Sequence, residues 1–285
     1  MSGARFGAKA VREQLDEHGL RVSRSLGQNF LIDPNIPEKT VRLSGIGKSC
    51  GVLEVGPGLG ALTSILCRTA GRVTAVEIDS RLLPILREAL EGVDNVEIIQ
   101  GDILKTDIAG LLRDKMPGME YHVCANLPYN ITTPVLSTFI NSGLFETITV
   151  MVQREVARRI CASPGSADYG AFTVFVNYHA KPEILFDVPP ECFLPRPEVF
   201  SSVVKIVKRP ERLLAAEDEA VFFRVVRAAF AQRRKTILNA LFAAFHSELQ
   251  KSEVEGIINS CGFDARIRGE TLGIDEFMRL SANFS

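Results

Sequence analysis

Apolar and polar positions follow a repeating order through the first two thirds of the chain, with short β-rich runs between longer stretches of helical spacing. Five runs rich in Val and Ile are expected to form strands: 52–55, 73–77, 96–100, 122–125 and 147–152. The stretches 61–70 and 81–90 carry apolar residues every three to four positions, which predicts helices. This alternation is typical of a doubly wound parallel sheet and predicts an α/β fold.

The pattern of apolar residues changes after about residue 170. Two more apolar runs, 172–179 and 202–208, are expected to be strands, separated by the proline-rich stretch 189–197. Helical spacing then predicts four helices: 218–231, 236–245, 252–260 and 274–282. We therefore expect two domains, 1–209 built on the sheet and a small all-helical domain over 210–285.

Composition and charge narrow the possible partners. No apolar run reaches the roughly 20 residues that a membrane helix needs, so we expect no membrane role. The formal net charge is −1, so any contact with RNA must come from local basic clusters. The cysteines and histidines are scattered without a Cys-x-x-Cys pair, which predicts neither disulfides nor a metal site. Acidic residues interrupt the basic ones near the start, so we expect no transit peptide and a cytoplasmic protein.

A candidate cofactor site begins at a glycine-rich turn. Gly56 and Gly58 follow the first expected strand directly and lead into a helix, where the backbone can approach a ligand closely. Glu77 ends the second strand and could accept hydrogen bonds from ribose hydroxyls, while Asp102 follows the third strand and could accept from an adenine amino group. These residues predict a nucleoside cleft. They leave NAD open, and a tight turn without a ligand is the alternative for the glycines.

A candidate catalytic motif, Asn126-Leu127-Pro128-Tyr129, follows the fourth expected strand. The exocyclic nitrogen of adenine is a poor nucleophile because its lone pair is delocalised into the ring. The Asn126 side-chain oxygen and a backbone carbonyl near Leu127 could accept its two N–H bonds, with Pro128 stiffening the backbone. Tyr129 can stack on the base. The structural alternative is a turn at the end of a strand, with Tyr129 packed in the core.

Taken in order, these residues resemble the ribosomal RNA adenine dimethyltransferase family. The matching blocks are 25–31, the Gly56 turn, Glu77, 101–102, 126–129, 153–158, 169–170, 193–197 and Ser201. The resemblance spans most of the chain and implies a Rossmann-like class I methyltransferase fold with S-adenosylmethionine as cofactor. It also implies that Asn29, Leu31 and Asn126 line the cofactor site, and that Phe193 faces Tyr129 across the target base.

The same resemblance implies the substrate. Members in bacteria dimethylate N6 of two adjacent adenosines near the 3′ end of small-subunit (16S) ribosomal RNA. We accordingly expect an RNA-binding enzyme of small-subunit biogenesis that acts on an assembling subunit as a monomer and uses no metal. The family usually carries a basic and then an acidic residue after Pro197, whereas this chain has Glu198 and Phe200. That departure bears on local RNA contacts and not on the chemistry.

Basic clusters predict where RNA phosphates bind. Arg224, Arg227 and Arg234 are three and seven positions apart on one expected helical stripe. Arg154 and Arg158 are one helical turn apart beside the catalytic region. A third cluster consists of Lys205, Lys208 and Arg209. For each cluster taken alone, an ordinary solvated surface is the alternative.

Three other functions are open to a chain with these motifs. The antibiotic-resistance branch acts on large-subunit RNA and shares the glycine turn and an Asn-x-Pro-Tyr/Phe-type motif. An RNA-binding assembly or transcription factor would keep the fold with little turnover, but the intact 126–129 motif and Glu77 favour catalysis. An NAD-dependent oxidoreductase would need a hydride partner and a proton-transfer group, and neither is identifiable in the sequence.

Overall fold

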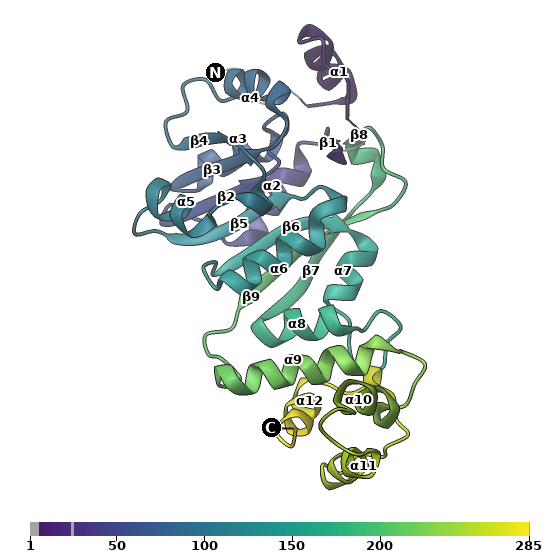
Figure 1. Ribbon diagram of the computed structural model, residues 1–285. Helices are drawn as coiled ribbons and strands as arrows, with labels where there is room; N and C mark the ends of the chain where they lie inside the picture. Colours follow the sequence, from purple (N-terminus) through teal and green to yellow (C-terminus); the bar gives the residue numbers. More distant parts are fainter. Residues whose placement is uncertain (1–5, 24–25, 285) are drawn as a thin grey trace. The chain divides into compact units, whose positions relative to one another are not determined.

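The computed structural model describes residues 6–23 and 26–284. Ser25, which begins one of the family blocks, lies outside the described residues. The chain forms two compact units (Figure 1). No helix within the described ranges is long and apolar enough to cross a membrane.

The division between the units does not follow a single point in the sequence. The first unit comprises the chain up to Ala157 together with Glu183–Lys208, and the second comprises Arg158–Pro182 and Arg209–Ser285. The segment from residue 158 to residue 182 therefore belongs with the C-terminal helices, although it precedes the expected boundary at 209.

The first unit is built around a sheet with the strand order β4-β3-β2-β5-β6-β9-β7, of which the first three residues of β7 belong to the second unit. Its strands are β2 (Cys50–Val55), β3 (Arg72–Glu77), β4 (Val96–Gln100), β5 (Glu120–Asn126), β6 (Thr147–Gln153), β7 (Ala180–Val188) and β9 (Ser201–Lys208). The first five strands of the order pair in parallel, while β9 pairs antiparallel to β6. The five expected parallel strands and the run at 202–208 are confirmed.

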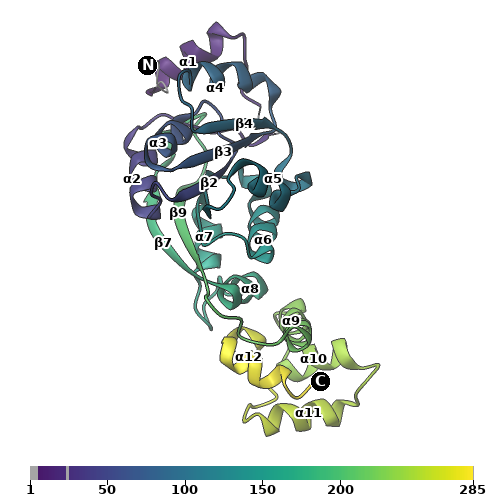
Figure 2. The same cartoon turned by 90° about the vertical axis from the view of Figure 1, so that its left-hand side faces the viewer.

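Helices cover both faces of this sheet. Figure 2 shows α2 and α3 on one face and α5 and α6 on the other. The bounds are α1 (Ala8–Glu17), α2 (Asn35–Ser44), α3 (Ala61–Thr69), α4 (Leu83–Ala89), α5 (Ile108–Lys115), α6 (Thr132–Ser142) and α7 (Arg154–Ile160). Val52 and Val73, in register on neighbouring strands, share a buried cluster with Leu66 of α3. Burial on both faces explains why the central strands read as continuous apolar runs.

One expected strand is wrong. The run 172–179 forms a helix, α8 (Ala171–His179), and the strand β7 begins directly after it. Val174 and Tyr178, four residues apart, are both buried on one face of α8, so tertiary packing outweighs the β propensity of this segment. The strand β7 was not predicted from the sequence because Pro182 and charged residues stand near its start. A proline is tolerated there because β7 lies at the edge of the sheet.

The second unit is helical. Besides α8 it contains α9 (Ala216–Ala231), α10 (Ile237–Phe245), α11 (Lys251–Ser260) and α12 (Ile274–Ser281). α9 packs against α8, α10 and α12, and the fully buried rings of Phe222, Phe245 and Phe277 belong to the same apolar core. The four expected C-terminal helices are confirmed.

Candidate active site

The glycine turn after β2 presents bare backbone to a cleft. Gly58 has φ 59°, and a Cβ at this position would lie 3.2 Å from a ring carbon of Phe30. Both observations require glycine, because a side chain here would be strained and would collide with that ring. The turn leads directly into α3, which begins at Ala61. The sequence therefore places unobstructed backbone at the point where a ligand can approach.

Glu77, the last residue of β3, is fixed by two backbone donors. Its Oε2 accepts a hydrogen bond from the Gly58 N–H at 3.1 Å, and its Oε1 accepts from the Asp79 N–H at 2.9 Å. Burial raises the pKa of Glu77, and these backbone bonds oppose the increase. A carboxylate has about four acceptor positions, so positions remain for ribose hydroxyls.

A polar network behind Glu77 was not predicted from the sequence. Gln28 Nε2 donates to Asp79 Oδ2 at 2.8 Å, and Arg81 donates to both Asp79 oxygens at 2.8 and 2.7 Å. The Arg81 guanidinium holds the pKa of Asp79 below its usual range. This network attaches the segment before β1 (Phe30–Leu31) to the segment that follows β3. The position of Gln28 within the 25–31 block was the only sequence signal for it.

A second carboxyl group lies deeper in the cleft. Glu54 is 1% exposed, and burial raises its pKa to about 8, with opposing effects from Thr63, which lowers it, and Glu77, which raises it. Glu54 is therefore largely protonated at neutral pH. Two backbone N–H donors, from Gly58 and Asp79, favour the charged form of Glu77 instead.

The motif residues lie where β5 ends. Asn126 Nδ2 donates to the backbone carbonyl of Asn29 at 3.3 Å, which leaves the side-chain oxygen available as an acceptor. Leu127 is buried, and its N–H donates to the Met151 carbonyl at 3.1 Å. The backbone that follows is thereby anchored to β6. Asn126 is thus held by contacts to two separate parts of the first unit.

The two aromatic residues differ in their surroundings. Tyr129 is half-buried at the cleft, and its hydroxyl hydrogen-bonds Ser201 Oγ at 2.7 Å. Burial raises the pKa of Tyr129, so its hydroxyl is neutral at physiological pH. Phe193 is 2% exposed, and its strand β8 (Phe193–Leu194) pairs antiparallel with β1 (Phe30–Leu31), with Phe193 opposite Leu31. Among the described residues, Phe193 is not part of the cleft lining.

The cleft has a volume of about 1020 Å³, including space that is open to solvent. It lies at the carboxyl ends of the parallel strands, as expected for an open α/β sheet. Its lining contains ten predicted residues: Asn29, Leu31, Gly56, Gly58, Glu77, Asp102, Asn126, Leu127, Pro128 and Tyr129. Ile78 and Ile103 also line it and were missed, although the 51% exposure of Ile78 marks an apolar side chain that a flat ring could cover.

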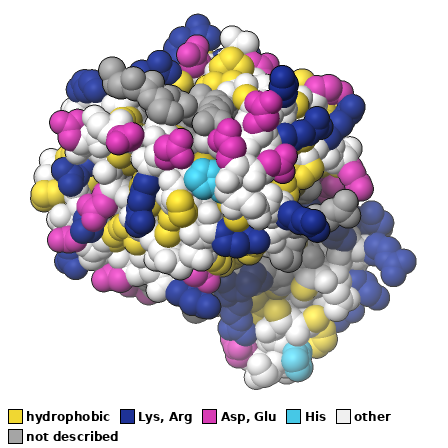
Figure 3. Space-filling view, turned by 90° about the horizontal axis from the view of Figure 1, so that it is seen from above, with side chains coloured by type: hydrophobic (Ala, Val, Ile, Leu, Met, Phe, Trp, Pro, Cys, Tyr) yellow, Lys and Arg dark blue, Asp and Glu magenta, His cyan; other side chains and the backbone are white. Residues whose placement is uncertain are grey.

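The basic residues near the sheet include one aromatic contact. Arg154 begins α7, and its guanidinium lies 4.5 Å from the ring centroid of Phe200, which is 39% exposed. The Arg154 N–H also donates to the Phe200 carbonyl at 2.9 Å. Basic and acidic side chains are interspersed over the face of the molecule in Figure 3, in keeping with the small net charge. The Arg154 and Phe200 pair is thus a local contact of a cation with an aromatic ring.

The expected arginine stripe in the second unit is not continuous. α9 ends at Ala231, so Arg234 lies beyond the helix that carries Arg224 and Arg227. Arg224 forms an ion pair with Glu248 at about 2.5 Å, and its guanidinium lies 4.0 Å from the Phe245 ring centroid. The Arg224 side chain therefore contacts residues of its own unit. Two arginines of the stripe, Arg227 and Arg234, are exposed, as is Arg158.

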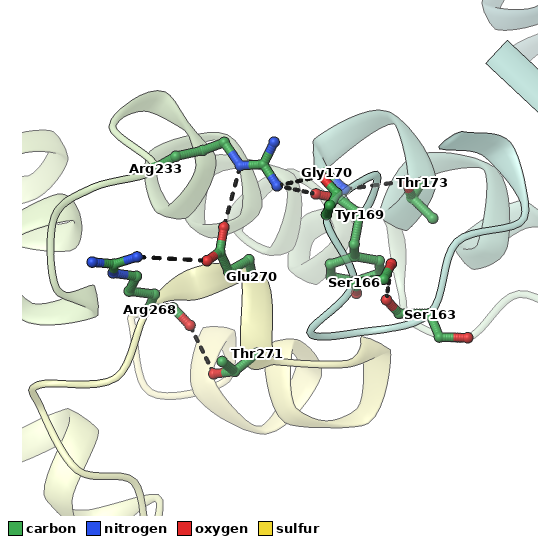
Figure 4. A network of polar contacts seen from close by, with 10 residues as sticks. Ser163, Ser166, Tyr169, Gly170, Thr173, Arg233, Arg268, Glu270 and Thr271 are labelled. Carbon is green, nitrogen blue, oxygen red and sulfur yellow. Dashed lines mark hydrogen bonds and ion pairs between the residues drawn. The ribbon is translucent and has the colours of Figure 1, made fainter. Parts of the chain in front are cut away.

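Arg233, beside the stripe, also has internal partners (Figure 4). Its Nε lies 3.2 Å from a Glu270 oxygen, and its Nη2 donates to the backbone carbonyls of Ala167 and Tyr169 at 2.7 and 3.3 Å. Glu270 is in turn 3.9 Å from Arg268. Arg233 therefore joins three segments of the second unit, and it shares the Glu270 carboxylate with Arg268.

The fold and the cleft are those of a Rossmann-like methyltransferase, with the same sheet, glycine turn and acidic residues. Two solved methyltransferase structures have a similar fold. A dimethyladenosine transferase from Plasmodium falciparum aligns with a TM-score of 0.73 and 27% identity, covering 88% of this chain and 95% of that one. The 23S rRNA methyltransferase ErmE aligns with a TM-score of 0.70 and 26% identity, covering 90% and 99%.

The family follows from the sequence comparisons. The family model for ribosomal RNA adenine dimethylase matches residues 19–278, and the chain belongs to this family. Ribosomal RNA small subunit methyltransferase A from Geobacillus thermodenitrificans is 46% identical over 274 residues, covering 95% of this chain and 94% of the relative. The protein of the same name from Clostridioides difficile is 43% identical over 273 residues, with 95% and 94% covered. The expected fold class, family and enzyme class are confirmed, and the oxidoreductase alternative is wrong.

Proposed function

We propose that this enzyme transfers methyl groups from S-adenosylmethionine to N6 of two adjacent adenosines near the 3′ end of small-subunit ribosomal RNA. The observation that carries the proposal is the single cleft that contains both Glu77 and the 126–129 motif. The names of the relatives with more than 40% identity support the small subunit as target. The product would be N6,N6-dimethyladenosine, formed in an assembling subunit in the cytoplasm.

The residues of the cleft suit a nucleoside with a charged tail. The Glu77 carboxylate would accept from the ribose hydroxyls, and Asp102 would accept from the adenine amino group. Gly56 and Gly58 offer bare backbone, and Asn29 and Leu31 also line the cleft. When bound, S-adenosylmethionine supplies an electrophilic methyl group on a sulfonium centre.

The motif would orient the target amino group. The oxygen of Asn126 and the carbonyl of Leu127 would accept its two N–H bonds, which directs the nitrogen lone pair out of the ring plane. The N–C bond forms as the S–C bond breaks, and the nitrogen then releases one proton to solvent. Orientation and fixed dipoles account for the acceleration, and no strong base is required. Tyr129 would stack on the base, and Phe193 would complete the stack once its ring becomes exposed.

RNA contacts are assigned to four arginines, of which Arg154 is half-buried and the others are exposed. Arg154 with Phe200 offers a cation beside an aromatic face, which suits a phosphate next to a stacked base. Arg158, Arg227 and Arg234 are exposed and would contact phosphates. Arg224 is less suited, because its ion pair with Glu248 already balances its charge. That the enzyme acts as a monomer remains a prediction.

A direct test uses small ribosomal subunits from cells that lack the modification. Purified enzyme and S-adenosylmethionine are incubated with these subunits, with large subunits and with each naked RNA, and nucleosides are analysed by mass spectrometry. Dimethyladenosine in small-subunit RNA alone supports the proposal. Dimethyladenosine in large-subunit RNA would replace it with methylation of 23S rRNA, as the name of the structurally similar ErmE states for that enzyme. Cofactor binding without methylation of any RNA would point to an assembly factor.

A further inference from the structure

The amino ends of the central strands, away from the catalytic cleft, bring together three potential metal ligands. Cys50 is the first residue of β2, Glu120 is the first residue of β5, and His122 lies two residues further along β5. The parallel register pairs Cys50 with Glu120 and Val52 with His122. Alternate residues of a strand share a face, so all three side chains project from the same side of the sheet.

The ligand atoms are close enough to share one ion. The Cys50 sulfur, a Glu120 carboxylate oxygen and a His122 ring nitrogen all lie within 4.8 Å of one another. Cys50 and His122 are buried, with 4% and 7% of their surface exposed, whereas Glu120 is exposed. The site therefore has a protected sulfur and nitrogen pair with a carboxylate at its solvent side.

An unsatisfied nitrogen marks this cluster as more than a chance grouping. His122 Nδ1 hydrogen-bonds Thr147 Oγ1 at 2.7 Å, but the buried Nε2 has no hydrogen-bond partner within the described part of the chain. A buried polar atom without a partner costs about 1–3 kcal/mol. A hydroxyl partner on one ring nitrogen also orients the other for a metal, as is common around metal-bound histidines.

The three side chains combine donor types that suit one metal ion. The Gly47 N–H donates a hydrogen bond to the Cys50 sulfur, with 3.4 Å between nitrogen and sulfur. The Glu120 carboxylate supplies one negative charge within the cluster. Bound thiolate would add a further negative charge. Sulfur, imidazole and carboxylate together are ligands that Zn²⁺ accepts in tetrahedral sites, with water in the fourth position.

We propose that Cys50, Glu120 and His122 form a Zn²⁺ site that links the starts of β2 and β5. The site lies at the amino ends of the strands, whereas the cleft lies at their carboxyl ends, so the ion would stabilise the sheet and take no part in methyl transfer. The sequence predicted no metal because 72 positions separate Cys50 from His122, and only the pairing of β2 with β5 brings them together.

The test measures metal binding directly. Metal-free full-length protein is titrated with CoCl₂, and sulfur-to-cobalt charge-transfer absorption in the near ultraviolet reports a cysteine ligand. The same protein is dialysed against ZnCl₂, and bound zinc is counted by mass spectrometry. We expect one ion per chain, the cobalt band, and a higher Tm with zinc.

Variants identify the ligands. Cys50→Ala and His122→Ala should each weaken zinc affinity at least tenfold, and Cys50→Ala should abolish the cobalt band. The exposed Glu120→Gln should weaken affinity without disturbing the fold, and circular dichroism checks each metal-free variant. Cys67→Ala, at a buried thiol outside the cluster, is the matched control and should bind as the wild type does. Absence of binding by wild type, or equal affinity in all variants, overturns the site. Methylation is assayed separately, so its failure would not affect this outcome.

Discussion

The side-chain amide of Asn126 donates a hydrogen bond to the backbone carbonyl of Asn29 at 3.3 Å, which ties the end of β5 to the segment before β1. The side chain of Asn29 does not take part, since its Nδ2 donates to the Gly27 carbonyl at 3.1 Å. The direction of the Asn126 oxygen is therefore set by backbone from a distant part of the chain. Asn29 and Asn126, which both line the cleft, are thus joined by a direct hydrogen bond.

Asn126→Ala should lower kcat by about 10²–10³ while the Kd for S-adenosylmethionine changes little, because one acceptor for the developing charge is removed. Single-turnover methylation and calorimetric titration measure the two effects. Asn141→Ala, at an exposed residue near the end of α6, is the matched control and should retain normal turnover. Turnover by Asn126→Ala close to the wild-type rate would refute the assigned role.

Glu77→Gln should raise the Kd for S-adenosylmethionine by about 10- to 100-fold, since hydrogen bonds to a charged group contribute about 1.5–3 kcal/mol. Glu77 also accepts bonds from Gly58 and Asp79, so the variant is checked for an unchanged fold by circular dichroism. Glu91→Gln, an exposed position, serves as control. An unaltered Kd in Glu77→Gln would exclude the ribose role.

Glu54 should make stability depend on pH. Its pKa is raised from 4.5 to about 8 in the folded protein, so the folded state keeps a proton that the unfolded chain releases. The contribution of this group to the free energy of unfolding is therefore present below pH 4.5 and is lost as pH rises toward 8, by at most about 1.4 kcal/mol per pH unit. Urea titrations between these limits should show a shallower fall for Glu54→Gln. Parallel curves for the two proteins would contradict the burial of a neutral Glu54.

Arg154→Ala should weaken binding to small subunits and reduce the slope of log affinity against log salt by about one, as expected for loss of one phosphate contact. The measurement is a filter-binding titration at several salt concentrations. Arg224→Ala is the comparison, because its guanidinium contacts Glu248 and Phe245 within the second unit. That variant should lower Tm and leave the salt slope unchanged. Equal slopes for Arg154→Ala and wild type would remove Arg154 from the RNA site.

Much of the first unit could be predicted because its signals are local. Parallel strands buried on both faces appear as apolar runs, and the carboxyl-end rule places the residues after them around one cleft. Ten predicted residues line that cleft for this reason. The helix α8 was not predictable from local pattern, since its β-branched residues suit a strand and only packing with α9 and α12 decides the outcome.

Contacts between segments that are distant along the chain could not be predicted from the sequence. The bond from Gln28 to Asp79 joins positions 51 apart, and the ion pair of Arg224 with Glu248 joins two helical regions. The spacing of Arg224, Arg227 and Arg234 suggested one basic face, but the end of α9 at Ala231 separates the last of them. Such contacts depend on where helices end and how strands align, which local patterns do not specify.

The pairing of β1 with β8 has a consequence for the order of events during protein synthesis. Phe30 and Leu31 leave the ribosome early, but their strand partners Leu194 and Phe193 are made much later. Until then, the wall of the cleft formed by this segment lacks its β-sheet support. A nascent chain should therefore complete this wall of the cleft only after Leu194 has left the ribosome.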